Sequence, residues 1–156
     1  MSASTLPPDL PIHLPAELQG FRLDHIGVAV QSLEAALPFY QLLGLQVLKS
    51  EAVPSEKVKV AFLNTGECHL ELLEPTSPDS PIAKSLEKRG PGIHHLCLKV
   101  QNLPELLQSL DAAGVQLIDK VPKPGADNKR VAFVHPKATG GILLELSEPM
   151  PGEQPA

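Results

Sequence analysis

The chain has 156 residues, of which 42% are hydrophobic and 20% charged, values typical of a globular protein with one domain. Its formal net charge of −5 argues against a nucleic-acid backbone as the main partner, and 3% aromatic residues argue against base-stacking surfaces. Cys68 and Cys97 are too few for a disulfide framework, and no apolar run is long enough to span a bilayer. Because no targeting segment is evident, we expect a cytoplasmic protein without a nucleic-acid or membrane partner.

Proline-rich segments flank the part of the chain that we expect to fold. Residues 1–20 and 149–156 are predicted to be extended tails, because proline cannot donate to a strand ladder. Residues 21–148 are predicted to form a single domain. It divides into module 1 at about 21–76, a linking helix at about 80–90 and module 2 at about 91–148.

The predicted domain contains an internal repeat. Residues 24–31 recur as 94–101, and each copy is followed by a helix cap, Ser32 or Asn102, and later by a glycine, Gly44 or Gly114. Two later segments also repeat, residues 60–63 as 131–134 and residues 70–72 as 144–146.

Each copy has the pattern strand, helix, strand, strand, strand. Short runs of Val, Ile, Leu and Phe bounded by turn residues predict the strands. Pro38 lies inside the first helical stretch and predicts a kink or a shorter helix. The predicted fold class is α+β, with two tandem βαβββ modules that form one open barrel-like sheet around a metal site.

One histidine and one glutamate occupy matched positions in the two copies. His25 and His95 lie on the first strand of each copy, and Glu71 and Glu145 lie between leucines on the last. Each of them alone would be read as an ordinary strand residue. A buried carboxylate is strongly disfavoured unless it is paired or binds a metal, and duplication brings equivalent positions together. The joint recurrence therefore favours a His₂Glu₂ site for an octahedral divalent ion.

Other histidines and a cysteine carry weaker signals. His69 shares a strand face with Glu71 and is either a neighbour of the site or a surface residue. His94 should face away from His95 in a structural role, and Cys97 is expected to be a small buried hydrophobe. His13 lies in the predicted tail and is given no role.

Basic residues cluster after the second predicted helix. The loop at 122–129 contains Gly125 and either meets the phosphates of an anionic ligand or forms a solvated surface. The candidate substrate contacts are His135, Lys123, Lys129, Arg130 and Lys137. No Walker loop, GxGxxG, GxSxG or CxxC motif supports nucleotide hydrolysis, dinucleotide redox or serine-hydrolase chemistry.

These motifs together resemble the vicinal oxygen chelate (glyoxalase) superfamily and, within it, the methylmalonyl-CoA epimerase family. The segments that carry the resemblance are LDHIGVAV (23–30), ELLEP (71–75), DSPIAK (79–84), GPGIHHL (90–96), FVHPK (133–137) and GILLEL (141–146). The His and Glu pattern marks the superfamily, whereas DSPIAK and GIHH point to the epimerases.

The resemblance implies one divalent metal ion per subunit, with ligands His25, His95 and Glu145 and with Glu71 as the fourth. Glu71 replaces the Gln of some epimerases and is similar to glyoxalase I. Co²⁺ is the expected ion, with Mn²⁺, Ni²⁺, Zn²⁺ or Mg²⁺ as alternatives. The resemblance further implies an acyl-CoA substrate, a homodimer and a place in propionate metabolism.

The implied reaction is epimerisation of methylmalonyl-CoA at C2 through an enolate. Some bacterial epimerases place a glutamate base on the strand that here spans 57–61, where this chain has no acid. Our hypothesis is that Glu71 and Glu145 form the acid/base pair while His25 and His95 hold the ion. The alternatives are a glyoxalase-I-like lactoylthiol lyase and a non-catalytic protein of this superfamily that binds a small ligand.

Overall fold

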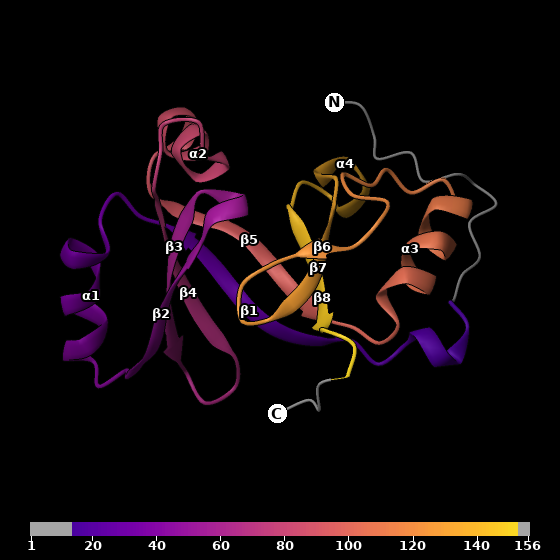
Figure 1. Cartoon of the computed structure of the whole chain (residues 1–156), viewed down its shortest axis with the longest axis horizontal. Coiled ribbons are helices and arrows are strands. Elements are labelled where there is room, and N and C mark those ends of the chain that lie inside the picture. The colour runs from indigo at the N-terminus through magenta and orange to yellow at the C-terminus, as the bar shows by residue number, and fades with distance from the viewer. Residues whose placement is uncertain (1–13, 153–156) are drawn as a thin grey trace. The chain divides into compact units, whose positions relative to one another are not determined.

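The computed structural model describes residues 14–152, which form two compact units. Unit 1 holds residues 14–23, 96–124 and 128–152, and unit 2 holds residues 24–95 and 125–127. The elements in chain order (Figure 1) are η1 Ala16–Leu18, β1 Arg22–Ala29, α1 Leu33–Leu42, β2 Val47–Val53, η2 Pro54–Glu56, β3 Val58–Asn64, β4 His69–Pro75, α2 Pro81–Arg89, β5 Gly92–Lys99, α3 Leu103–Ala112, β6 Lys123–Pro124, β7 Lys129–Val134, α4 Pro136–Thr139 and β8 Leu144–Pro149. The strand-helix-strand-strand-strand order predicted for each copy is present, with α2 between the copies.

Unit 2 contains the strand order β2-β3-β4-β1, in which β1 and β4 are parallel and the other neighbours antiparallel. One face of this sheet packs against α1 through Leu33, Ala61 and Leu72. The other face packs against α2 through a second apolar cluster, which we call the α2 cluster. Its buried members are Ala29, Val53, Val58, Val60, Phe62, Leu73, Ile82 and Leu86. Burying both faces explains why β3 reads as a nearly continuous apolar run.

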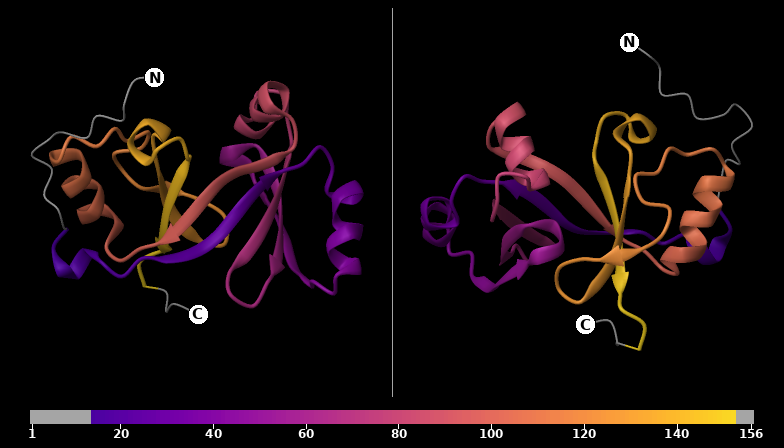
Figure 2. Two further views of the ribbon diagram at one scale, coloured as in Figure 1. Left: turned by 180° about the vertical axis from the view of Figure 1, so that it is seen from behind. Right: turned by 45° about the horizontal axis from the view of Figure 1, so that its top comes forward.

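Unit 1 repeats this plan with the strand order β5-β8-β7-β6, and β5 and β8 are parallel. Its core lies between the sheet and α3 and includes Leu103, Leu107, Ala132 and Leu146. Figure 2 shows α1 alongside the strands of unit 2 and α3 alongside those of unit 1. The second copy's longer β7–β8 connection holds the short helix α4.

Two of the predicted helix starts are formed as expected. The Ser32 side chain accepts a hydrogen bond from the Ala35 amide, and the Ser80 side chain accepts one from the Ile82 amide. The prediction for Asn102 was wrong, because its side chain donates to Glu105 and caps no backbone amide. The Glu148 carboxylate caps this helix instead, because it accepts a hydrogen bond from the Leu103 amide at 3.0 Å.

Two further expectations differ from the structure. Pro38 does not shorten α1, which continues on both sides of it to Leu42. Part of the predicted N-terminal tail is folded, because Ala16–Leu18 forms a turn of 3₁₀ helix and Leu18 is buried in the core of unit 1. The remainder of the predicted tails, residues 1–13 and 153–156, lies outside the described residues. Across residues 14–152 no helix has the length and apolar character of a membrane span.

Candidate metal centre

The face of unit 2 that carries the α2 cluster also carries polar residues. Strand register pairs Gly27 with Glu71, Glu71 with Phe62, and Phe62 with Lys49. Paired residues point to the same side of a sheet, so these four form a row across β1, β4, β3 and β2. His25 lies two residues before Gly27 on the same side of β1. The register thus brings His25 and Glu71 onto one face.

The His25 imidazole is buried and surrounded by polar groups. Its Nδ1 lies 2.7 Å from Glu71 Oε2 and 2.7 Å from Asp24 Oδ2, and its Nε2 lies 3.0 Å from His95 Nε2. His25 and Glu71 are each 5% exposed and His95 is 7% exposed. The structure therefore brings three of the four predicted ligands together within unit 2, with Glu71 on the Nδ1 side of His25.

His95 owes its position to a missing side chain on the neighbouring strand. A Cβ atom added to Gly27 would lie 2.3 Å from His95 Cε1 and 2.7 Å from its Nε2, well inside van der Waals contact. The imidazole therefore occupies the space that any other residue at position 27 would fill. The prediction that His94 faces away was wrong, because His94 Nδ1 lies 2.9 Å from His95 Nδ1.

The donor set fits a divalent transition-metal ion. Metal–nitrogen bonds of about 2.0–2.1 Å place two cis ligands about 3 Å apart, which matches the separation of the two Nε2 atoms. Imidazole and carboxylate donors suit Co²⁺, Mn²⁺, Ni²⁺ and Zn²⁺. A carboxylate on the far nitrogen of a ligating histidine commonly fixes its ring, and both Asp24 and Glu71 lie there.

Glu145 occupies in unit 1 the place that Glu71 occupies in unit 2. It is buried on β8, where it pairs with Cys97 of β5 and Phe133 of β7. These partners are the repeat equivalents of Gly27 and Phe62. Glu71 and Glu145 therefore occupy equivalent positions in the two copies, as the sequence repeat predicted.

The other predicted residues have local partners. His69 pairs with His25 in the β1–β4 register, so it lies on the same face. His135 caps α4, and its Nδ1 accepts from the Lys137 amide. Cys97 is fully buried, as expected, and its thiol donates to Ser147 Oγ at 3.2 Å.

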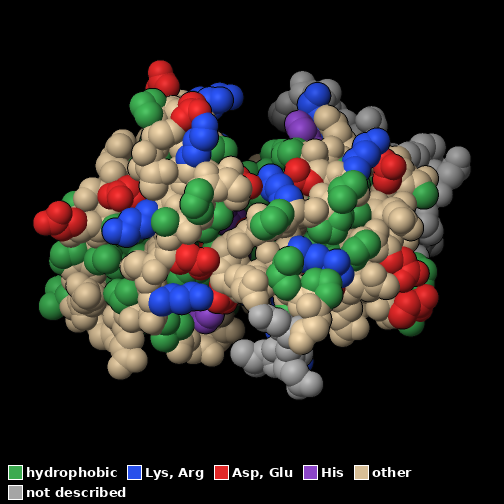
Figure 3. Space-filling view, viewed as in Figure 1, with side chains coloured by type: hydrophobic (Ala, Val, Ile, Leu, Met, Phe, Trp, Pro, Cys, Tyr) green, Lys and Arg blue, Asp and Glu red, His purple; other side chains and the backbone are tan. Residues whose placement is uncertain are grey.

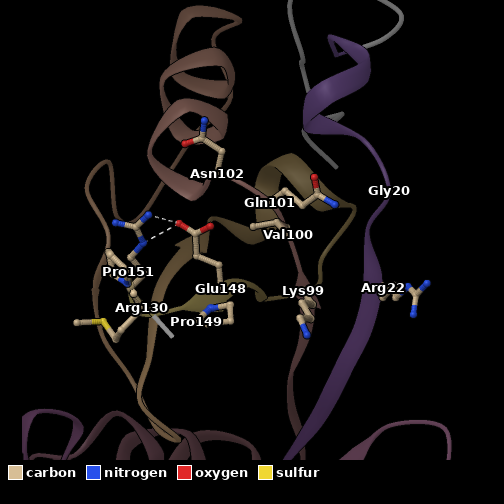
Figure 4. A pocket seen from close by; sticks show the side chains of 12 residues that line it. Gly20, Arg22, Lys99, Val100, Gln101, Asn102, Arg130, Glu148, Pro149 and Pro151 are labelled. Atoms are coloured by element: carbon tan, nitrogen blue, oxygen red, sulfur yellow. Dashed lines mark hydrogen bonds and ion pairs between the residues drawn. The ribbon is translucent and has the colours of Figure 1, made fainter. Parts of the chain in front are cut away.

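The basic candidates of unit 1 mostly contact acids or aromatic rings. Lys123 Nζ lies 5.2 Å from the centre of the Phe133 ring and 3.5 Å from Asp119. Arg130 Nε donates to Glu148 at 2.6 Å in a pocket of about 520 Å³ (Figure 4). On the face shown in Figure 3, basic and acidic side chains lie next to one another, so this face has no extended field of one sign.

Sequence reasoning overlooked Asp24 and a group on β2. Lys49 Nζ lies 5.1 Å from the centre of the Phe62 ring, which is the direct neighbour of Glu71. Glu51, two residues later, lies on the same face of the sheet. The alternation of charge at positions 49 and 51 was the available signal, but assigning it needs the register of β2 on β3.

Comparison with known proteins identifies the family. Residues 24–133 match the family described as the Glyoxalase/Bleomycin resistance protein/Dioxygenase superfamily. The chain belongs to this superfamily. Membership confirms the predicted fold class and the resemblance on which it was based.

Several members of the superfamily are similar to this chain over most of its length. The chain is 49% identical to the uncharacterized protein YqjC of Bacillus subtilis over 82% of this chain and 92% of that protein. It is 40% identical to human mitochondrial methylmalonyl-CoA epimerase over 81% of this chain and 73% of the human protein. It is also similar to the structure of a methylmalonyl-CoA epimerase in complex with methylmalonyl-CoA and NH₄⁺, with a TM-score of 0.78, 33% identity and coverage of 86% and 98%.

Proposed function

We propose that this protein is a methylmalonyl-CoA epimerase, an isomerase that interconverts the (2R) and (2S) forms of methylmalonyl-CoA. Relatives of that name at 40% identity, and a similar structure that binds the substrate, support this activity. The observation that carries the proposal is the buried group in unit 2, where His25 contacts both His95 and Glu71. Deprotonation beside a thioester needs a positioned base and stabilisation of the enolate oxygen, which a nearby carboxylate and a metal held by these histidines would supply.

We assign the metal ligands as His25, His95, Glu71 and Glu145. The 3.0 Å separation of the two Nε2 atoms supports His25 and His95, and Glu71 is included because it contacts the other nitrogen of His25 and matches the repeat pattern. Glu145 is included because it is the repeat equivalent of Glu71 and is equally buried. A bound divalent ion would supply a Lewis acid that stabilises negative charge on the thioester oxygen. Co²⁺ is our first choice, with Mn²⁺, Ni²⁺, Zn²⁺ and Mg²⁺ as alternatives.

The acid/base work is assigned to Glu71 and Glu145. Inversion at C2 needs one proton acceptor and one proton donor on opposite sides of a planar enolate. Glu71 Oε2 lies on the Nδ1 side of His25, away from the nitrogen that faces His95, so in this arrangement its carboxylate is not committed to the nitrogen pair. That position supports a role for Glu71 in moving the C2 proton while His25 and His95 remain ligands.

We propose a cytoplasmic homodimer that acts in propionate metabolism on an acyl-CoA. Predicted contacts to the CoA portion are His135, Lys123, Lys129, Arg130 and Lys137.

A single-epimer assay tests the activity. Protein stripped with a chelator and then reloaded with Co²⁺ should convert (2R)-methylmalonyl-CoA into the equilibrium mixture, and the stripped protein should not. Turnover of the glutathione hemithioacetal of methylglyoxal, with none of the CoA ester, would identify a lactoylthiol lyase instead. Binding of the ester without turnover by the reloaded protein would identify a non-catalytic ligand-binding protein.

A further inference from the structure

A turn from the second copy belongs to the compact unit of the first copy. Residues 125–127 lie between β6 and β7 in the chain, yet their contacts assign them to unit 2. Ala126 packs against the α2 cluster, whose members include Val60 and Phe62. This turn therefore covers part of the sheet face that also carries His25 and Glu71.

Two residues of β2 hold this turn. The Asp127 amide donates to Glu51 Oε2 at 2.9 Å, and the Asp127 carboxylate forms an ion pair with Lys49. Lys49 Nζ also lies 3.9 Å from Glu51 Oε2, so the three residues form one group, which we call the latch. Asp127 and Asn128 have φ angles of 59° and 53°, a left-handed conformation that Asp and Asn adopt more readily than other non-glycine residues and that is common in tight turns.

The latch stands on the same sheet face as the buried carboxylate. Lys49 pairs with Phe62 and Phe62 pairs with Glu71, while Glu51 pairs with Val60 in the adjacent row. Phe62 and Val60 are almost completely buried. A buried apolar layer thus runs from Glu71 to the latch, and Ala126 packs against it.

We propose that Lys49 and Glu51 are positioning residues, which hold Ala126 as a wall of the pocket for the alkyl branch at C2 of the acyl-CoA. The inference rests on the proposed function, because it takes Glu71 as the group that acts on C2. The branch of the substrate is a methyl group and needs an apolar surface beside the reacting carbon. Ala126 is only partly buried and provides one, with Val60 and Phe62 packed behind it, and its position then limits the length of branch that fits.

Steady-state kinetics on the metal-loaded full chain tests the wall. For Lys49→Gln and Asp127→Asn we expect KM for methylmalonyl-CoA to rise about three- to tenfold with kcat nearly unchanged. Each change removes the partly exposed ion pair between Lys49 and Asp127, which holds Ala126 in place. The ratio of kcat/KM for ethylmalonyl-CoA to that for methylmalonyl-CoA should rise. Ala126→Gly should raise the same ratio by about tenfold, the usual worth of one methylene in a pocket.

Matched controls separate the latch from a general loss of charge. Lys57 forms a similarly exposed ion pair with Asp79 in the same unit, so Lys57→Gln should leave KM and the substrate ratio unchanged. Lys49→Arg should restore wild-type values because it keeps the ion pair. Unchanged KM and an unchanged ratio in Lys49→Gln, Asp127→Asn and Ala126→Gly, in an enzyme with normal epimerase activity, would overturn the inference.

Hydrogen exchange provides a readout that does not depend on activity. Glu51→Gln should speed the exchange of the Asp127 amide, because the charged acceptor of that amide is lost. An unchanged exchange rate would show that Glu51 does not hold the turn. A wild-type protein without epimerase activity would refute the proposed function and the pocket wall together. An active wild type whose latch variants have unchanged KM and an unchanged substrate ratio would refute only the role of the latch.

Discussion

At the scale of single residues, the missing side chain of Gly27 sets the position of a histidine. The His95 ring fills the space where a Cβ would lie, and Gly27 is also the register partner of Glu71. The imidazole of His95 therefore depends on the absence of a side chain at Gly27, and Glu71 lies beside this position on β4. Close backbone approach of this kind is a common reason for a glycine inside a strand.

Gly27→Ala should displace the His95 ring without unfolding the sheet. We expect the affinity for Co²⁺ to fall about 10- to 100-fold, the usual loss when the support of a metal ligand is disturbed. Isothermal titration calorimetry on the chelator-treated protein measures it. The control is Ala36→Gly on α1, which packs against the opposite face of the sheet and should leave the Co²⁺ affinity unchanged. Gly66→Ala would not serve as a control because Gly66 has a positive φ. Equal Co²⁺ affinity in Gly27→Ala and the wild type would contradict the role assigned to His95.

Asp79, which precedes the cap of α2, offers a test of local electrostatics. Hydrogen bonds from the Lys57 ammonium and then from the Ser77 hydroxyl lower the pKa of Asp79 from 3.8 to about 2. A lowered pKa means that these contacts favour the folded state above pH 3.8 and lose that effect as the pH falls towards 2. In Lys57→Gln the pKa of Asp79 should return towards 3.8, as followed by NMR titration of its carboxyl carbon. A midpoint that stays near 2 would exclude Lys57 as the main cause.

The predictability of individual residues from sequence depended on the repeat. His25, His95, Glu71 and Glu145 could be selected because each recurs in a matched position. Asp24 could not, because its contact with His25 depends on side-chain rotation between neighbouring residues. The same applies to the contact between His94 and His95, since strand alternation alone predicts opposite directions for two successive side chains.

At the scale of elements, both long helices that follow a first strand begin on a glutamate from the last strand of their copy. The Leu33 amide donates to Glu74 Oε1 and the Leu103 amide donates to Glu148 Oε1, each at 3.0 Å. A carboxylate at a helix N-terminus satisfies a free amide and interacts favourably with the helix dipole. This carboxylate at the helix N-terminus therefore occurs in both copies of the module.

Glu148→Gln should weaken α3 and the end of β8 together. Glu148 is buried and binds both the Leu103 amide and the Arg130 side chain, so the change leaves a partly buried guanidinium without its charged partner. We expect the free energy of unfolding to fall by about 2–3 kcal/mol, as seen for hydrogen bonds to charged groups. Urea denaturation measures this value. Glu105→Gln, at an exposed position on the same helix, should change it by less than about 0.5 kcal/mol.

The helix starts show where propensity fails as a guide. Ser32 and Ser80 act as caps, whereas Asn102 has a left-handed backbone and yields the capping role to Glu148. A long-range carboxylate cannot be assigned from local sequence because residues 102 and 148 come together only in the folded sheet. Of the two effects predicted for Pro38, the shorter helix was wrong, because α1 continues through Pro38 to the same length as α3.

At the scale of the whole molecule, the internal repeat allowed the fold to be predicted from the sequence. Two copies of the same strand and helix order predicted two modules of the same connectivity, and each copy places its first and last strands in parallel contact. The repeat alone did not predict that residues 125–127 would belong to unit 2. Their contacts place them there, and Asp127 lies against Lys49 and Glu51 of that unit.

The central claim is that a buried carboxylate beside His25 removes the C2 proton of methylmalonyl-CoA. Proton NMR in D₂O measures it directly, with the metal-loaded protein and a single epimer of the substrate. Deuterium should enter C2 as the epimers interconvert. Glu71→Gln should slow the exchange by about 10²- to 10⁴-fold while still binding Co²⁺, and Glu67→Gln, at an exposed loop position, should not slow it. Epimerisation without deuterium at C2, or wild-type exchange in Glu71→Gln, would contradict the account.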